Sequence, residues 1–155
     1  MAGRIDARLQ QLGIVLPDAP APAANYVPAV RSGNLLFVAG QVPAKEGKDQ
    51  VVGKLGANVS PEQGQFAARI CAINILAQVK AALGGDLDRV VRCVRLGGFV
   101  NAVPEFGDHP KVINGASDLM VEVFGEAGKH ARAAVGCASL PRNVAVEVDA
   151  VFEVA

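Results

Sequence analysis

The chain of 155 residues contains 51% hydrophobic and 19% charged residues, which suits one domain with a sizeable core. Fifteen lysine and arginine residues balance fifteen aspartate and glutamate residues, so no net field attracts the protein to phosphate backbones or anionic membranes. Six phenylalanines, one tyrosine and no tryptophan leave few surfaces on which bases could stack. We therefore expect a protein that binds neither nucleic acid nor membranes. The high apolar fraction further suggests that copies of the chain bury surface against one another.

Cysteine and histidine usage indicates a cytoplasmic protein without a metal or cofactor. Cys71, Cys93 and Cys137 are odd in number and lie in apolar runs, as buried thiols of a reducing compartment do. His109 and His130 are the only histidines, and neither has a second ligand at metal-binding spacing. The first residues contain no apolar core of signal-peptide length, and no stretch reaches the ~18 apolar residues of a membrane span.

The first part of the chain predicts an appended arm followed by the main domain. Residues 4–12 can form a short helix, and the Pro/Ala-rich tract that follows cannot continue it, so residues 1–23 are expected to be an arm and residues 24–155 the domain. Residues 26–30 and 35–41 read as two strands joined by a turn.

The rest of the chain predicts two helices and three strands. Ser60 and Gln63 form a capping box that starts a helix running to about residue 83. A β-rich stretch over residues 87–103 predicts a strand broken or bulged at Gly97-Gly98, and a second helix is expected over residues 110–124. This order is not a strict alternation of strands and helices, so we expect an α+β fold, a mixed sheet with both helices packed on one face.

The last 26 residues read as a β-hairpin that carries an arginine and a glutamate. From residue 144 to residue 153, apolar residues alternate with a largely charged set that includes Glu147. Arg132 lies on the charged side of the preceding strand, and a loop over residues 138–141 would place it opposite Glu147. A guanidinium can grip a carboxylate with two hydrogen bonds, and a neighbouring acid can orient water. The alternative is a structural cross-strand ion pair worth roughly 0.2–1 kcal/mol.

Several stretches resemble the RidA (YjgF) family of imine deaminases. These are NYVPAV at residues 25–30, GNLLFVAGQVP at residues 33–43, the helix containing Asn114, and the segment from Arg132 to Glu147, in the family's order and approximate spacing. The N-terminal extension and His130 resemble a longer-chain subgroup. The resemblance implies a chorismate-mutase-like fold, a homotrimer, and active sites in the clefts between subunits.

The resemblance also implies roles for particular residues. Arg132 matches the arginine that binds the carboxylate of a 2-imino or 2-enamino acid, and Glu147 the glutamate that orients water. The matching substrate-binding positions are Tyr26, Ala39, Gly40, Asn114, Ala133 and His130. Other interpretations stay open: Tyr26 as a wall residue, Asn114 in a hydrogen bond at a helix start, and His130 on a wet surface. Ala39 and Ala134 replace the family's common serine and cysteine.

The function expected from the resemblance is hydrolysis of imino acids to 2-keto acids and ammonia. Water adds to the electrophilic imine carbon, and the resulting carbinolamine collapses without a covalent enzyme intermediate. The alternative is a non-catalytic trimer of the same fold that binds a small carboxylate or keto acid. A ribonuclease or translation inhibitor is a third interpretation, which the neutral charge disfavours.

Overall fold

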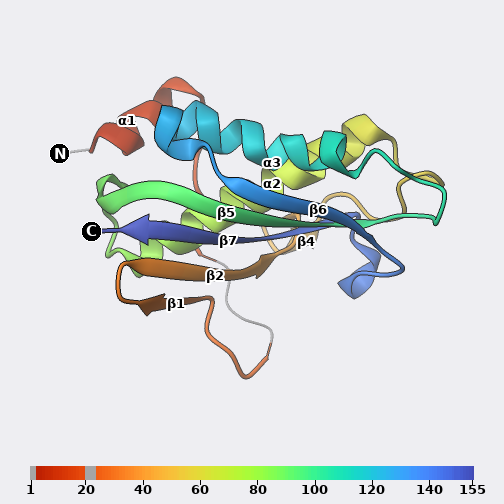
Figure 1. Cartoon of the computed structure of the whole chain (residues 1–155), viewed down its shortest axis with the longest axis horizontal. Helices are drawn as coiled ribbons and strands as arrows, with labels where there is room; N and C mark the ends of the chain where they lie inside the picture. Colours follow the sequence, from red (N-terminus) through yellow and green to blue (C-terminus); the bar gives the residue numbers. More distant parts are fainter. Residues whose placement is uncertain (1–2, 20–23) are drawn as a thin grey trace.

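The computed structural model describes residues 3–19 and 24–155, and its centre is a five-stranded sheet. The strands lie in the order β1-β2-β7-β5-β6, and a separate pair, β3 and β4, lies beyond the end of β2 (Figure 1). The sheet strands are β1 (Ala29–Ser32), β2 (Leu35–Gln41), β5 (Val90–Asn101), β6 (Ala131–Cys137) and β7 (Val146–Val154). The short pair is β3 (Ala44–Lys45) and β4 (Lys48–Asp49).

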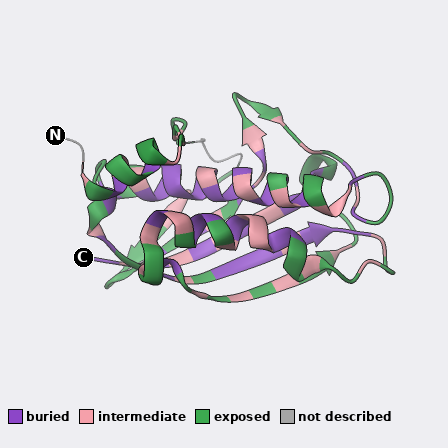
Figure 2. Ribbon diagram, turned by 90° about the horizontal axis from the view of Figure 1, so that it is seen from above, coloured by how far each residue is buried: buried purple, intermediate pink, exposed green. Residues whose placement is uncertain are grey.

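Two long helices cover one face of this sheet, as predicted. They are α2 (Pro61–Ala82) and α3 (His109–Phe124), and Figure 2, seen from above, shows them side by side in front of the strands. The sheet is mixed, because β5 and β6 run parallel while the other neighbours are antiparallel. The α+β class with both helices on one face is confirmed.

Residue patterning explains which face of the sheet is covered. Along β7, buried residues alternate with half-buried ones, and the buried set is Val146, Val148, Ala150, Phe152 and Val154. These side chains pack against the apolar stripes of α2 and α3 to form one core. The other face of β7 carries Glu147, Asp149, Val151 and Glu153, so the carboxylate of Glu147 lies on the face turned away from the helices.

The predicted C-terminal hairpin is wrong, because β5 lies between β6 and β7. β6 pairs in parallel with β5 on one side, and β7 pairs with β5 in antiparallel fashion on the other. A parallel neighbour needs a long crossover, and α3 supplies it between β5 and β6. The alternation of apolar residues determines which face a strand buries but not which strand lies next to it. Because β6 and β7 follow one another in the sequence, the pattern predicts a hairpin that does not form.

Two further details of the strands differ from expectation. Gly97 and Gly98 lie inside β5, paired on both sides, and the irregularities of β5 fall between residues 90 and 95 instead. Gly98 is needed for space, since a Cβ there would lie 2.5 Å from Ile113 of α3. The first strand begins at Ala29, three residues later than predicted.

The helix starts follow the capping signals of the sequence. The Ser60 hydroxyl accepts from the amide of Gln63, and the Gln63 side chain accepts from the amide of Ser60, as predicted. At the N-terminal helix α1 (Arg4–Gln11), the carboxylate of Asp88 accepts from the amides of Arg4 and Ile5. Ile5 and Leu9 join the core, so α1 packs on the body of the molecule, and the boundary at residue 23 stays a prediction.

Burial of the thiols is confirmed for two of the three cysteines. Cys71 and Cys93 are buried, and burial raises the pKa of the Cys93 thiol to about 12, whereas Cys137 is only half-buried. Among residues 3–19 and 24–155, no helix combines the length and the apolar character that a membrane span requires.

Candidate functional site

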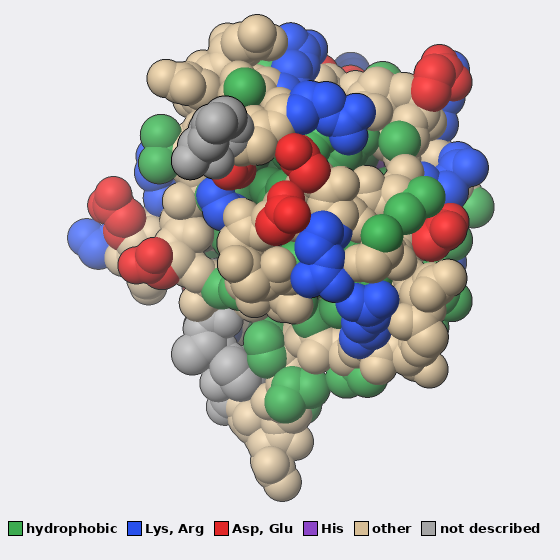
Figure 3. Space-filling model, turned by 90° about the vertical axis from the view of Figure 1, so that its left-hand side faces the viewer, with side chains coloured by type: hydrophobic (Ala, Val, Ile, Leu, Met, Phe, Trp, Pro, Cys, Tyr) green, Lys and Arg blue, Asp and Glu red, His purple; other side chains and the backbone are tan. Residues whose placement is uncertain are grey.

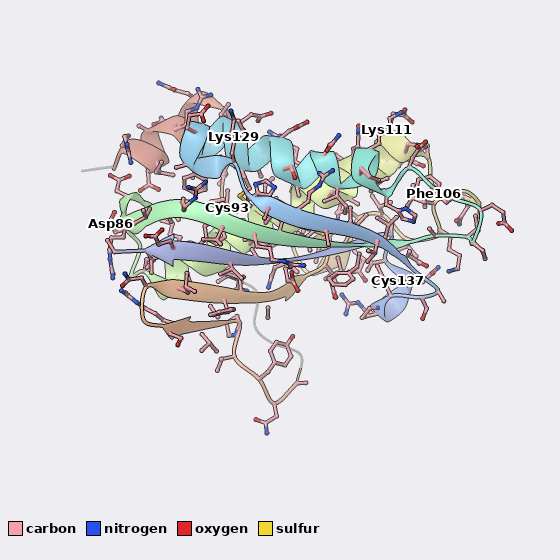
Figure 4. The ribbon with its side chains drawn as sticks, viewed as in Figure 1. Asp86, Cys93, Phe106, Lys111, Lys129 and Cys137 are labelled. Atoms are coloured by element: carbon pink, nitrogen blue, oxygen red, sulfur yellow. The ribbon has the colours of Figure 1, made fainter. Side chains whose placement is uncertain are left out.

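Arg132 lies on β6 with its guanidinium folded against α3. Its Nη1 donates to Asn114 Oδ1 at 2.8 Å and to the Ser117 hydroxyl at 3.0 Å, while Nη2 donates to the carbonyl of Pro110 at 3.2 Å. β6 pairs with the inner strand β5 and runs from near Lys129 to Cys137 (Figure 4). Strand and helix together hold the guanidinium at one edge of the sheet.

His130 extends this group of polar side chains. Its Nε2 lies 2.8 Å from the Ser117 hydroxyl, which also accepts from Arg132, and its Nδ1 lies 2.6 Å from the carbonyl of Gly128. Asn114 lies five residues after the start of α3 and accepts from Arg132, so it does not cap the helix. We call Arg132, Asn114, Ser117 and His130 the arginine face.

A pocket of about 360 Å³ lies at the junction of β2, β7, α2 and the β3–β4 pair. Seven of its lining side chains are polar: Tyr26, Gln41, Asp49, Asn74, Gln78, Arg142 and Glu147. Gly40 and Pro141 are among the remaining lining residues. We call this cavity the glutamate pocket. It brings together three residues predicted from the sequence, Tyr26, Gly40 and Glu147.

Glu147 is half-buried in this pocket, directly over Gly40. A Cβ built on Gly40 would lie 3.0 Å from both Cδ and Oε2 of Glu147, so any side chain there would shift the carboxylate by a few tenths of an ångström. Burial raises the pKa of the Glu147 carboxyl, the Asp149 carboxylate raises it further, and the Arg142 guanidinium offsets part of the rise. A carboxylate with a raised pKa is a better proton acceptor once ionised, which suits a group that orients water.

Arg142 and Asp49 form a two-point ion pair at the side of the pocket. Arg142 Nε donates to Asp49 Oδ2 at 2.8 Å and Nη2 donates to Oδ1 at 2.9 Å. The guanidinium holds the pKa of Asp49 below its usual value. Arg142 and Asn143 both adopt positive φ angles, of 53° and 60°, which is strained backbone for arginine and better tolerated by asparagine.

The floor of the pocket contains the carboxamide of Asn74 from α2. Its Nδ2 donates to the carbonyls of Val42 and Ala44, at 3.0 and 2.9 Å, and the residue is 2% exposed. Sequence reasoning missed Asp49, Asn74, Gln78 and Arg142. A signal was present for two of them, since Asn74 and Gln78 are four residues apart in an otherwise apolar stretch of α2 and therefore share a helix face.

Within one chain the arginine face and the glutamate pocket do not meet. Arg132 pairs with Leu96 of β5, whereas Glu147 pairs with Phe99 on the opposite side of that strand. Along the direction of β5, the backbones of Arg132 and Glu147 are three residues apart, which is about 10 Å. Across the sheet they are two strand spacings apart, which is again about 10 Å. Residues three apart on a strand also point to opposite faces, so the prediction that Arg132 stands opposite Glu147 is wrong.

The remaining predicted positions lie close to one half or the other. Ala39 precedes Gly40 on β2, and its carbonyl accepts from the Gln41 side chain at 3.0 Å. Ala133 is exposed on β6 and pairs with Gly97, on the face opposite to Arg132. One chain therefore presents two half-sites, each with part of the predicted set.

Comparison with known proteins identifies the family. The model of a family described as "YjgF/chorismate mutase-like, putative endoribonuclease" matches residues 6–154. The chain belongs to the YjgF family. The curated relative Protein TCP17 of Trypanosoma cruzi is 54% identical over 153 residues, which are 98% of this chain and 95% of that protein. A protein of Dermatophagoides farinae named 2-iminobutanoate/2-iminopropanoate deaminase is 30% identical over 139 residues, 89% of this chain and 92% of its own length.

A solved structure supports the same assignment. The crystal structure of Atu1372 from Agrobacterium tumefaciens, a protein described as having unknown function, superposes with a TM-score of 0.92 at 55% identity. The match covers 97% of this chain and 92% of that one. The YjgF fold predicted from the sequence is thus confirmed. The assignment to a longer-chain subgroup stays a prediction.

Proposed function

We propose that this protein is a hydrolytic deaminase that converts reactive 2-imino and 2-enamino acids to 2-keto acids and ammonia. The observation that carries the proposal is Glu147, a half-buried carboxylate with a raised pKa held over Gly40 in a polar pocket of about 360 Å³. Membership of the YjgF family and the deaminase name of the mite relative support it.

The proposed site is completed by a second copy of the chain. One subunit contributes the arginine face and its neighbour contributes the glutamate pocket, so that both halves line one cleft of a homotrimer. Exposed apolar side chains on the sheet face that the helices leave open favour such contacts. They include Val30 at 52%, Phe37 at 45% and Val135 at 45% exposure.

In this cleft Arg132 binds the substrate carboxylate and Glu147 aligns the attacking water. Asn114 and Ser117 accept from Nη1 of Arg132 and the carbonyl of Pro110 accepts from Nη2, and we propose that the Nε edge, with the second hydrogen of Nη2, binds the ligand. Water adds to the carbon of the imine, which is protonated on nitrogen, as Glu147 takes a proton from that water. Glu147 then returns the proton to the nitrogen of the carbinolamine, and loss of the hydroxyl proton forms the keto C=O as ammonia leaves. None of these steps needs a metal, a cofactor or a covalent intermediate. The cytoplasmic location remains a prediction of the sequence.

The test is release of ammonia and keto acid from imines that an amino-acid oxidase generates in the assay. Arg132→Ala and Glu147→Gln should each lower kcat/KM about 100-fold. Arg4→Ala is the matched control, because Arg4 is exposed on α1, away from both half-sites. Equal rates for the wild type and both site variants would remove the deaminase proposal.

A second candidate function is binding of a small carboxylate without turnover. Ala39 favours it, because an alanine beside Gly40 offers no hydroxyl to position water or substrate. A thermal-shift screen of 2-keto acids discriminates the two functions. Stabilisation that Arg132→Ala abolishes, in a protein without deaminase activity, would support the binding protein.

The description of the family model also names an endoribonuclease, which the charge of this chain disfavours. Lysine and arginine total 15, as do aspartate and glutamate. On the end of the molecule in Figure 3, basic and acidic side chains are intermixed. Nucleic-acid binding depends on basic surfaces, so we propose a small-molecule ligand.

A further inference from the structure

We propose that the glutamate pocket selects substrates whose side chain ends in an N–H donor, a carboxamide or a guanidinium. This inference rests on the proposed function, because it places the substrate carboxylate on Arg132 of one subunit and the side chain in the pocket of the next. It goes beyond that function by naming the class of amino acid from which the imine derives.

The charges of the pocket disfavour an acidic side chain. Two carboxylates, Asp49 and Glu147, line the cavity with one guanidinium, that of Arg142. Asp49 occupies both the Nε and the Nη2 of Arg142, so this cation is already paired. A second carboxylate on the substrate would therefore meet acidic oxygens, and the described lining residues include no unpaired cation to balance them.

The floor of the pocket offers a hydrogen-bond acceptor. The two hydrogens of Asn74 Nδ2 face the carbonyls of Val42 and Ala44, which fixes the orientation of the amide. Among the described residues no hydrogen bond reaches its Oδ1, so we assign this oxygen, which can only accept, to the ligand. An apolar side chain would strip water from this oxygen without replacing the hydrogen bond, which is unfavourable, whereas an N–H group would replace it.

The turn that carries Arg142 is held in place by hydrogen bonds to the buried Asn101 and to Gly53, on the side facing away from the pocket lining. Asn143 follows Arg142 in the strained turn, and its Oδ1 accepts from Asn101 Nδ2 at 2.9 Å. Asn101 is fully buried and also donates to the carbonyl of Val144, and the carbonyl of Asn143 accepts from the amide of Gly53. These bonds keep Arg142 beside Asp49, so the pairing is a fixed property of the pocket.

The first experiment compares imines with side chains of equal length. Imines generated by a broad-specificity oxidase from glutamine, methionine and glutamate present a donor, an apolar thioether and a carboxylate at similar size. We expect kcat/KM to fall in that order, with about tenfold between the glutamine and glutamate imines. The arginine imine tests the cationic donor and should exceed the glutamate imine as well. If the methionine or glutamate imine is processed fastest, the inference is wrong.

The second experiment changes the pairing of Arg142. Asp49→Asn removes one carboxylate and releases the Nε and Nη2 of Arg142, so the preference of glutamine over glutamate should shrink about tenfold. Asp118→Asn is the matched control, because Asp118 is exposed on α3. Circular dichroism establishes that each variant is folded. Arg142→Met removes the guanidinium altogether, so no cation becomes available to the substrate and the glutamate imine should stay disfavoured. An unchanged ranking in folded Asp49→Asn would overturn the inference.

Binding of the matching 2-keto acids separates failure of the inference from failure of the deaminase proposal. Calorimetric titration of the wild type with the keto acids of glutamine, methionine and glutamate needs no turnover. The same ranking without ammonia release would support the pocket's selectivity and reject the enzyme. Ammonia release with equal affinities and rates for all three would keep the enzyme and reject the selectivity.

Discussion

The arginine face and the glutamate pocket are built in different ways, although each holds one charged group of the proposed reaction. The arginine face is a set of side chains on two adjoining elements, in which Asn114 and Ser117 directly contact Arg132. In the glutamate pocket, backbone geometry positions the charged group: Gly40 lies below the Glu147 carboxylate, and the turn at Arg142 lies beside it. Substitutions in the first should therefore disturb binding of the substrate carboxylate, whereas substitutions at Gly40 or Glu147 should disturb the position of the reacting water.

The largest expected effect is recovery of activity when two inactive variants, one without Arg132 and one without Glu147, are mixed in the same trimer. Arg132→Ala and Glu147→Gln proteins should each be nearly inactive alone, because every cleft then lacks one charged group. If each cleft takes one half from each of two neighbouring subunits, every trimer that contains both variants has one cleft of its three with both groups, which is about a third of the clefts. Mixed trimers, obtained by co-expression and purified through both tags in turn, should thus restore about a third of wild-type activity. Absence of restoration in verified mixed trimers would show that the halves do not combine across subunits.

A smaller but still large effect is expected from Gly40→Ala. The added Cβ would lie 3.0 Å from Glu147 Oε2 and displace the carboxylate, so kcat should fall about 10- to 100-fold while the fold persists. Gly107→Ala is the matched control, because no heavy atom lies within 4 Å of a Cβ there. Kinetics and thermal unfolding of the two variants measure the difference. A Gly40→Ala enzyme as active as its control would mean that Glu147 tolerates displacement and does not align the water.

The sequence predicts the parts of both halves better than it predicts their arrangement. The capping box at Ser60 depends on neighbours in the chain, so it could be recognised from the sequence. The placement of β5 between β6 and β7 depends on pairing across more than 30 residues, which alternation of apolar side chains does not encode. Arg132 and Glu147 were recognised by family resemblance, but their separation within one chain follows from that strand order.

The residues around Glu147 show a second limit. Asp49 and Arg142 are 93 positions apart and looked like ordinary loop charges, yet they form a two-point pair in the pocket. The conformation that brings them together includes a positive φ angle at Arg142, a residue type that rarely adopts one. Local backbone propensity therefore disfavours this turn. Tertiary contacts stabilise it instead, including the hydrogen bond from the buried Asn101 to Asn143.

A moderate effect on binding should follow from Asn114→Ala. The guanidinium of Arg132 would lose the 2.8 Å hydrogen bond to Asn114 Oδ1, so KM should rise roughly three- to tenfold with a smaller change in kcat. Asp118→Ala, at an exposed position of the same helix, is the control. Steady-state kinetics with one imine measure both constants. A fall in kcat at constant KM would instead place Asn114 in the chemical step.

The smallest effects should appear in the pH dependence of Glu147. Because its pKa is raised above 4.5 in the folded chain, kcat/KM should decline on the acid side at a pH above the usual range for glutamate. The same shift has a consequence for stability: the folded state favours the protonated carboxyl, so stability decreases as pH rises from below 4.5 through the raised pKa.

Glu147→Gln tests this linkage through its free energy of unfolding. The glutamine stays neutral, so the variant should be more stable than the wild type at neutral pH, by less than about 1 kcal/mol, and the difference should vanish as pH falls below 4.5. Denaturant unfolding from pH 4 to pH 8 measures it, and Glu153→Gln on the same face of β7 is the control. A variant less stable than the wild type at neutral pH would mean that the carboxylate is stabilised where it lies. The glutamate pocket would then be a structural ion-pair site, and its contrast with the arginine face would disappear.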